Sequence, residues 1–202
     1  MNLFKESNSR KIFIRRHSAE GASQIAECGL CRLGPEDIEE MAALHNGVAK
    51  GLSRDIFAAS TYEELERFLS DEGLSIGIRH KGKLVTARTI KMGRAWTDEA
   101  LEAYEIKLDE DERPAVTGFC VVDWEFRGNN VQYLTQYLVE DIVAETHTSL
   151  ITTVSPKNIF SLDNILTCNF RIVGIKEVYG GYLRFILKKD FRPSLLPIWT
   201  HG

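Results

Sequence analysis

Residues 121–132 read VVDWEFRGNNVQ, and this stretch decides how the rest of the chain is interpreted. An apolar run stops at Arg127 and Gly128, and a helical pattern starts directly after them. Free backbone N–H groups at a helix start, close backbone approach at Gly128 and the charge of Arg127 suit a phosphate group. The junction therefore predicts an anion site at the end of a buried strand. Many strand-to-helix turns carry a glycine, so this prediction needs support from the rest of the sequence.

The composition of the 202 residues is that of one globular domain, with 44% hydrophobic and 27% charged residues. A formal net charge of −4 and the lack of a basic stripe disfavour nucleic-acid binding. No apolar run approaches the roughly 20 residues that span a membrane. Lys5, Glu6 and Arg10 interrupt any signal-peptide core, so we expect a cytoplasmic protein.

The cysteines are interpreted as apolar packing residues. Cys28 and Cys31 form a CxxC pair, but no second CxxC or paired His follows at ligand spacing. The pair also lies in a strand-like segment, whereas a redox pair sits at a helix start. No metal site is therefore expected.

Periodic apolar positions predict strands and helices that alternate within one domain. Helices are expected to begin at Pro35, at the capping box of Thr61 and Glu64, after Gly128, and at Ser155. The third of these runs to about residue 146, with a core face of Val131, Leu134, Leu138 and Ile142. Strands are expected at residues 11–16, 28–33, 74–79, 83–92, 115–124, 149–154, 170–178 and 182–188.

Two segments break this regularity. Residues 94–113 are strongly acidic, and we interpret them as a solvated insertion with a short helix. The functional alternative is an acidic rim that attracts a cationic amine. Residues 191–202 form an apolar tail that is expected to dock on its own chain or on a second copy, as in a homodimer. The apolar residues of this tail are Leu195, Leu196, Ile198 and Trp199.

The order of elements resembles the GNAT superfamily of acyl-CoA-dependent N-acyltransferases. No dinucleotide-binding, Walker, zinc-protease or serine-hydrolase motif is present. The family's phosphate-loop signature is Arg or Gln, two residues, Gly, one residue, then Gly or Ala. Arg127 matches its first position, whereas Asn130 and Gln132 stand where small residues are expected. Asn tolerates positive φ well, so the backbone path can be kept.

A second motif supports the resemblance, which covers about residues 30–190. Asn158, Ser161, Asn169 and Phe170 match the spacing of a family helix that starts at an Asn and ends at Gly-Phe. In this chain Asn169 again replaces the Gly. The residues around Ser155 and Tyr179 look like a bacterial branch of the family.

The fold that this resemblance implies is an α/β (α+β) domain. Its mixed, mostly antiparallel sheet would have about six to seven strands, flanked by about four helices. The fourth and fifth strands would separate into a V-shaped splay. In this chain these two strands would be residues 115–124 and 149–154.

The resemblance also implies that acetyl-CoA or another acyl-CoA binds in the splay. Main-chain groups of Cys120, Val121 and Val122 would bind pantetheine, and one N–H would polarise the thioester carbonyl. Asn158, with the small Ser161 beyond it, would reach the pantetheine from the other side; the alternative for Asn158 is helix capping. The pyrophosphate would lie beside Arg127, on the N–H groups of Gly128, Asn129, Asn130, Val131 and Gln132.

The acid and the base of the reaction are less visible. Many relatives use a Tyr seven residues beyond the Asn, and Ile165 occupies this position. Cys168, Tyr179 and Ser155 are the candidate general acids, with core packing as the alternative for Cys168. The candidate bases are Asp123, Glu125, Glu102, Tyr104 and Glu105, with water as the alternative.

The resulting hypothesis is an N-acetyltransferase that moves an acetyl or short acyl group directly from CoA to a primary amine of a small molecule or peptide. Two alternatives stay open. One is a non-catalytic acyl-CoA-binding or regulatory domain, which Asn130 and Ile165 favour. The other is a transferase on the same fold that uses an acyl carrier protein or an aminoacyl donor, although the net acidic charge argues against it.

Overall fold

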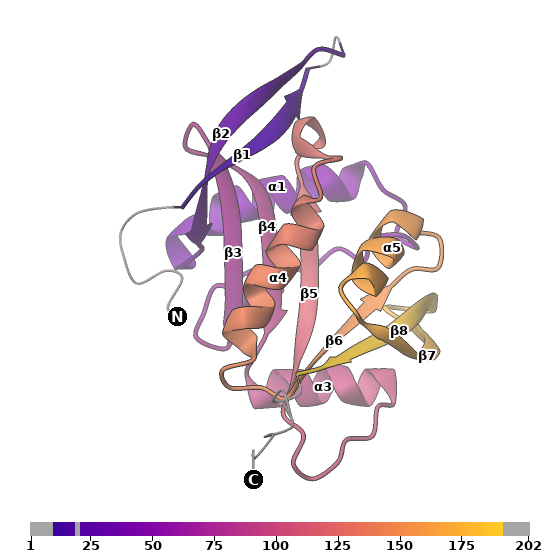
Figure 1. The fold of residues 1–202 in the computed structure, drawn as a ribbon. Coiled ribbons are helices and arrows are strands. Elements are labelled where there is room, and N and C mark those ends of the chain that lie inside the picture. Colours follow the sequence, from indigo (N-terminus) through magenta and orange to yellow (C-terminus); the bar gives the residue numbers. More distant parts are fainter. Residues whose placement is uncertain (1–9, 19–20, 192–202) are drawn as a thin grey trace, which may run out of the picture.

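The computed structural model describes residues 10–18 and 21–191, which form one eight-stranded sheet in the order β1-β2-β3-β4-β5-β6-β8-β7 (Figure 1). Neighbouring strands are antiparallel except for β5 and β6, which are parallel. The strands are β1 (Arg10–His17), β2 (Ser23–Arg32), β3 (Gly73–His80), β4 (Lys83–Lys91), β5 (Pro114–Val122), β6 (Ser149–Val154), β7 (Arg171–Val178) and β8 (Tyr182–Asp190).

Five α-helices in the described residues cover the two faces of the sheet. In Figure 1, α4 and α5 lie in front of the sheet and α1 lies behind it. None of the helices in the described part of the chain is long and apolar enough to cross a membrane. The helices are α1 (Ile38–Lys50), α2 (Tyr62–Phe68), α3 (Arg94–Tyr104), α4 (Val131–Val143) and α5 (Ile159–Thr167), with short 3-10 helices η1 (Pro35–Asp37) and η2 (Trp124–Phe126).

The buried side chains form a separate core on each face of the sheet. On one face, Val139 of α4 and Ile165 of α5 pack in a single cluster with residues of the central strands. On the other face, Met41 of α1 and Phe68 of α2 belong to a second cluster, and Leu101 of α3 belongs to a third. The sheet is therefore the middle layer of three.

The V-shaped splay predicted between residues 115–124 and 149–154 is present. β5 and β6 pair only over three residues each, up to Val116 on β5 and Ile151 on β6. Beyond these residues the two strands separate, while each keeps its other neighbour, β4 or β8. The predicted fold class is confirmed. The eight strands and five α-helices of the described residues exceed the six to seven strands and four helices that the family resemblance implied, and they equal the numbers expected from the apolar periodicity.

Two predicted element ends were wrong because short turns intervene. β5 ends at Val122 rather than at residue 124, since Asp123 caps a 3-10 turn through its Oδ1, which accepts from Glu125 N at 3.2 Å. The last helix begins at Ile159 rather than at Ser155. Ser155 instead closes a turn, because its carbonyl accepts from Asn158 N at 2.9 Å.

The predicted core face of α4 was also wrong in part. Val131 is buried as expected, but Leu134 is 36% exposed and its neighbours Thr135 and Gln136 are fully buried. These two polar side chains are buried because they bond a buried guanidinium, that of Arg88 on β4. Arg88 Nε donates to Thr135 Oγ1 at 3.0 Å, and Nη1 donates to Gln136 Oε1 at 2.5 Å.

The acidic segment at residues 94–113 contains the expected helix, but this helix is not solvated on all sides. Trp96, Leu101 and Tyr104 of α3 are buried against the sheet, and only the outward face of the helix carries the exposed carboxylates. Apolar spacing at three and four residues within the acidic run produces this core face. The predicted apolar tail (Leu195, Leu196, Ile198 and Trp199) lies outside the described residues.

We expect Gly118→Ala to lower the free energy of unfolding by about 1–3 kcal/mol. A Cβ at position 118 would overlap the Phe68 ring and crowd Thr89 Oγ1. Gly47→Ala is the matched control, because Gly47 lies inside α1 with open space around its Cβ position, and we expect a gain of about 0.5–1 kcal/mol. Urea unfolding measures both changes, and a Gly118→Ala protein as stable as the parent would contradict the packing described.

Candidate active site

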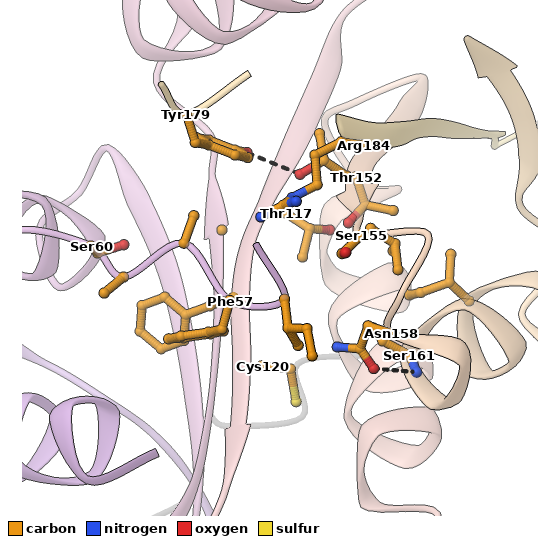
Figure 2. Close-up of a pocket in the computed structure, with 18 of the residues that line it drawn as sticks. Phe57, Ser60, Thr117, Cys120, Thr152, Ser155, Asn158, Ser161, Tyr179 and Arg184 are labelled. Carbon is orange, nitrogen blue, oxygen red and sulfur yellow. Dashed lines mark hydrogen bonds between the residues drawn. The ribbon is translucent and has the colours of Figure 1, made fainter. Parts of the chain in front are cut away.

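A cavity lies where β5 and β6 separate, and it encloses about 970 Å³ of empty space, including solvent at its mouth. Its walls come from the strands β4, β5, β6 and β8, from α2, α3, α5 and the first turn of α4, and from the β7–β8 turn and the loop between α1 and α2. Figure 2 shows Cys120, Asn158 and Ser161 toward one end of this cavity, and Tyr179 and Arg184 toward the other.

The predicted anion loop has the backbone that its residues suggested. Gly128 has φ +74° and Asn130 has φ +55°, so both occupy the left-handed region. Asn130 is the N-cap of α4 but makes no side-chain cap bond, and the first main-chain bond of the helix runs from Leu134 N to Asn130 O at 2.9 Å. The N–H groups of the first turn, including those of Val131 and Gln132, are therefore left for an anion or solvent.

Asn129 anchors this loop to the first strand. Its Oδ1 accepts from Arg15 N at 2.9 Å, and its Nδ2 donates to Arg15 O at 2.6 Å, so the side chain pairs with β1 as a strand residue would. Arg127 is exposed; its Nε donates to Val122 O at 3.3 Å, which leaves its terminal nitrogens free of that bond. The loop thus has a fixed backbone and a cation at its edge.

Gln132 points between α4 and α5 rather than into solvent, which answers a question that the sequence left open. Its Nε2 donates to Ser161 Oγ at 2.9 Å, and both residues line the cavity. Asn158 also lines the cavity, and its Oδ1 accepts from Ser161 N at 3.1 Å. The capping alternative for Asn158 is therefore confirmed, and its pantetheine role stays a prediction.

The cavity wall on β5 lies earlier in the strand than predicted. Thr117, Gly118, Phe119 and Cys120 line the cavity, whereas Val121 is 1% exposed and packs in the core under α1 and α2. Neither Val121 nor Val122 lines the cavity. A β-bulge explains the geometry, because Thr117 and Cys120 pair with Ile90 and Arg88, so that two residues of β5 face one of β4.

A chain of hydroxyl groups reaches the cavity from the β7–β8 turn. Tyr179 OH lies 2.8 Å from Tyr104 OH and 2.9 Å from Thr153 Oγ1, and all three residues line the cavity. Tyr179 has φ +55°, an uncommon conformation for an aromatic residue, and two glycines follow it. Burial raises the pKa of Tyr104. Of the two tyrosines, Tyr179 is the more exposed residue.

The other predicted acids are placed less favourably. Cys168 is fully buried and does not line the cavity, and burial raises the pKa of its thiol to about 11. Ile165, one turn earlier, takes the position facing the cavity. Ser155 lines the cavity, but its Oγ accepts from Lys157 N at 3.2 Å.

Most of the predicted bases lie away from the cavity. Asp123 pairs with Lys83 and Glu125 with Arg16, beyond the end of β5. Glu102 and Glu105 are exposed and are not among the lining residues, so of the predicted bases only Tyr104 is.

Sequence reasoning missed Glu64, the one carboxylate among the described residues that line the cavity. The sequence signal that included Glu64 was the capping box of Thr61 and Glu64, which identified the start of α2. Glu64 Oε2 accepts from Thr61 N at 3.1 Å, and its Oε1 lies 3.9 Å from Lys91 Nζ. A residue assigned to helix capping therefore also supplies a charge to the site.

His45 of α1 supports the wall of the cavity from behind. It is fully buried, with ring centroids 5.3 Å from Phe57 and 4.8 Å from Phe119. Ser60 N donates to its Nε2 at 3.2 Å, which assigns the ring proton to Nδ1, 3.2 Å from Asn46 Oδ1. Burial lowers the pKa of His45, so the neutral ring holds the loop between α1 and α2 in place.

Comparison with known proteins identifies the fold. No family model and no curated protein sequence matches the chain. Among solved structures, a GNAT-family acetyltransferase from Streptococcus pneumoniae is 18% identical, with a TM-score of 0.61 over 81% of this chain and 98% of that one. Arabidopsis thaliana NAA60 in complex with acetyl-CoA is 13% identical, with a TM-score of 0.64 over 81% and 98% of the two chains.

A third structure, the ribosomal-protein-S18-alanine N-acetyltransferase from Escherichia coli, is 12% identical, with a TM-score of 0.60 over 85% of this chain and 99% of that one. The three structures come from two bacteria and a plant, so they do not distinguish a bacterial branch. At these identities the likeness establishes the fold, which is the GNAT fold.

We expect His45 to make the protein less stable as the pH falls below about 6.5, the ordinary pKa of histidine in an unfolded chain. The unfolded state then binds a proton that the folded state resists, because burial lowers the pKa of the folded ring. This contribution of His45 to the free energy of unfolding is fully present above pH 6.5. It declines toward pH 5 by at most about 1.4 kcal/mol per pH unit. Urea unfolding between pH 5 and 7.5 should show this slope.

The variant His45→Gln should flatten that slope, since an amide can accept from Ser60 N without titrating. His147→Gln is the control, because His147 is only partly buried and is remote from the cavity lining. Equal slopes in the parent and in His45→Gln would show that His45 is not held neutral.

Proposed function

We propose that this protein is an acyl-CoA-dependent N-acyltransferase that transfers an acetyl or short acyl group to a primary amine in a direct ternary complex. The observation that carries the proposal is the cavity between β5 and β6. It joins the first turn of α4, on one face of the sheet, to the Tyr179 hydroxyl at the other end. A thioester in the cavity would lie between an anion site and a proton donor.

On the donor side, the chain offers groups suited to each part of CoA. The N–H groups of Gly128, Asn130 and Gln132 would hold the pyrophosphate, with Arg127 beside it. On the side of β5 that faces β6, the main chain beyond Val116 has no strand partner among the described residues. Its main-chain groups on that side can bond an extended pantetheine arm. Arg127 and the backbone loop lie outside the cavity, which suits a long ligand with its diphosphate at the mouth.

The reaction that fits this arrangement forms one bond and breaks one. The nitrogen lone pair of a neutral amine attacks the thioester carbonyl carbon, so that a C–N bond forms and the C–S bond breaks. The nitrogen loses a proton and the departing CoA thiolate gains one. An N–H of the β5 bulge would stabilise the oxyanion between these two steps.

Two groups are placed to handle these protons. Tyr179 OH is our candidate acid for the thiolate, because it lies in the cavity within a hydroxyl chain. Glu64 is our candidate for receiving the ammonium proton, directly or through water, because it is the described carboxylate on the cavity wall. A thiol pKa of about 8.5 means that the leaving group needs only modest help.

A non-catalytic acyl-CoA-binding protein is the second candidate, and it is favoured by Ile165, which lines the cavity where many relatives carry a Tyr. The two candidates differ in turnover. Calorimetry with acetyl-CoA tests binding, and release of the CoA thiol in the presence of a panel of primary amines tests transfer. Failure to bind any acyl-CoA would overturn both candidates, and binding without turnover would favour the second. Transfer only from an acyl carrier protein would favour the third hypothesis, a carrier-dependent transferase on the same fold.

Removing the cation of the anion loop should weaken CoA binding. We expect Arg127→Ala to raise the Kd for acetyl-CoA about tenfold, since a charge-assisted phosphate contact contributes roughly 1.5 kcal/mol. The salt dependence of Kd should also fall. Lys83→Ala is the control, because Lys83 is an exposed cation already paired with Asp123 at 3.0 Å. An unchanged Kd in Arg127→Ala would place the diphosphate elsewhere.

Removing the Tyr179 hydroxyl should slow the chemical step. We expect Tyr179→Phe to lower kcat about 100-fold while the Kd for acetyl-CoA stays the same, because general acids commonly contribute 10²- to 10⁴-fold. Tyr182→Phe makes the same chemical change on the neighbouring strand, at a residue outside the cavity lining. If both variants keep the parent kcat, another group protonates the thiolate.

A further inference from the structure

The charges that line the cavity are predominantly positive. Arg88, Lys91 and Arg184 are cations, and Glu64 is the carboxylate among the described lining residues. Arg88 is bonded to α4, because its Nε, Nη1 and Nη2 donate to Thr135, to Gln136 and to the carbonyl of Gln132. The unassigned cations are therefore Lys91 and Arg184.

Arg184 is a buried cation without a described counter-ion. The residue is 3% exposed, and its guanidinium donates to three carbonyls: Asp55 O at 2.6 Å, Leu183 O at 3.0 Å and Arg54 O at 3.3 Å. No carboxylate in the described residues forms an ion pair with it; the carboxylate of Asp55 pairs with Lys157 at 2.5 Å. A buried charge that is bonded only to neutral acceptors is costly to keep unless a ligand completes it.

The guanidinium still has donors to offer. It carries five N–H groups, and the three bonds to carbonyls use two on Nη1 and one on Nη2. One N–H on Nη2 and the Nε–H are left, and such an adjacent pair can bind a carboxylate through two parallel bonds. Because Arg184 lines the cavity, a ligand can reach it there (Figure 2).

The position of Arg184 on the sheet indicates which reactant it meets. Side chains alternate along β8, so Arg184 shares a face with Ile186, which packs under α3, whereas Leu187 packs with α4 and α5. The groups assigned to CoA, such as Gln132 and Ser161, come from α4 and α5. Arg184 also bonds the loop between α1 and α2, so it belongs to the side opposite the CoA arm.

Lys91 and Glu64 lie on that same side of the sheet. Lys91 Nζ is 4.8 Å from the centroid of the Trp96 ring and 3.9 Å from Glu64 Oε1, so the ion pair is loose. No carboxylate of the acidic segment at residues 94–113 lines the cavity. Glu105 of this segment pairs with Lys176, and its Glu112 pairs with Lys188.

We propose that the amine acceptor is an aminocarboxylate, an amino acid or a similar small molecule, whose carboxylate pairs with Arg184 while its amine faces Glu64. This assignment rests on the proposed acyltransferase function and specifies its acceptor. The acceptor carboxylate supplies the counter-ion that Arg184 lacks, and the amide-forming step is otherwise unchanged. Lys91 adds a second positive charge that favours an anionic acceptor over a simple cationic amine.

The test is a matched panel with acetyl-CoA: the common amino acids, their carboxamides and the corresponding amines without a carboxylate. We expect kcat/KM for the best amino acid to exceed that for its carboxamide at least 100-fold. Arg184→Gln should lower this acid-to-amide ratio at least 30-fold, since a truncated charge pair in a desolvated site commonly loses that much. A general loss of folding would instead lower kcat/KM for the amino acid and for its carboxamide equally, so that the acid-to-amide ratio would stay the same.

Lys176→Gln is the matched control. Lys176 lies directly opposite Arg184 in the β7–β8 register, but it pairs with Glu105 and does not line the cavity. Its variant should keep both the acid-to-amide ratio and the rate. An equal loss of the ratio in the two variants would show a diffuse charge effect and would overturn the assignment to Arg184.

Calorimetry with acetyl-CoA separates this proposal from the one on which it rests. Failure of the protein to bind any acyl-CoA would overturn the acyltransferase function itself. A chain that binds acetyl-CoA but acylates carboxamides and plain amines as well as acids, or no panel member, overturns the aminocarboxylate alone. Succinyl-CoA tests the other source of a carboxylate: an Arg184-dependent preference for succinyl-CoA over acetyl-CoA would place the carboxylate on the acyl group and overturn the acceptor assignment.

Discussion

The separation of β5 from β6 is the constraint on which the rest of the structure depends. The two parallel strands pair only as far as Val116 and Ile151, after which main-chain groups at the centre of an eight-stranded sheet lack a strand partner. Such groups need hydrogen bonds from another source, and an extended ligand can supply them. The bulge opposite Thr89, where Phe119 N donates to Thr89 Oγ1 at 3.0 Å, bends β5 away and exposes the glycine at position 118 to the gap.

The gap divides the sheet into two arms, β1 to β5 and β6 to β8. α4 connects these two arms. Arg88 on β4 donates to Gln136, whose Nε2 donates to Glu140 Oε1 at 2.9 Å. Glu140 in turn pairs with Lys189 on β8 at 2.5 Å. This buried polar network crosses the helix from one arm to the other, so the helix that presents its N-terminus to the gap is held by both arms. Breaking one partner would leave buried charge uncompensated, which is far costlier than an exposed pair.

The two sides of the cavity are built from different chemistry. Toward α4 and α5, the available donors are main-chain N–H groups and amides such as Gln132 and Asn158, which suit the phosphates and amides of a large invariant ligand. Toward the loop between α1 and α2, ionic side chains predominate, namely Glu64, Lys91 and Arg184. Ionic groups discriminate strongly between small molecules, because an unmatched charge is penalised in a desolvated site. The acceptor side is therefore where specificity would reside.

The sequence by itself determined the order of the elements and the positive-φ turns, and its resemblance to the GNAT superfamily implied the splayed strands. The turns follow from local rules, because Gly128, Asn130 and Asn169 adopt positive φ as their residue types allow. Apolar periodicity indicates which segments form strands and helices. Tertiary structure alone decided which face of α4 is buried, because Thr135 is buried by a partner 47 residues away on β4. It also decided the acceptor side, since Arg184 meets the loop between α1 and α2 across 129 residues of chain. Periodicity reports whether a side chain is apolar, whereas burial of a charge depends on a partner that only the folded chain brings near.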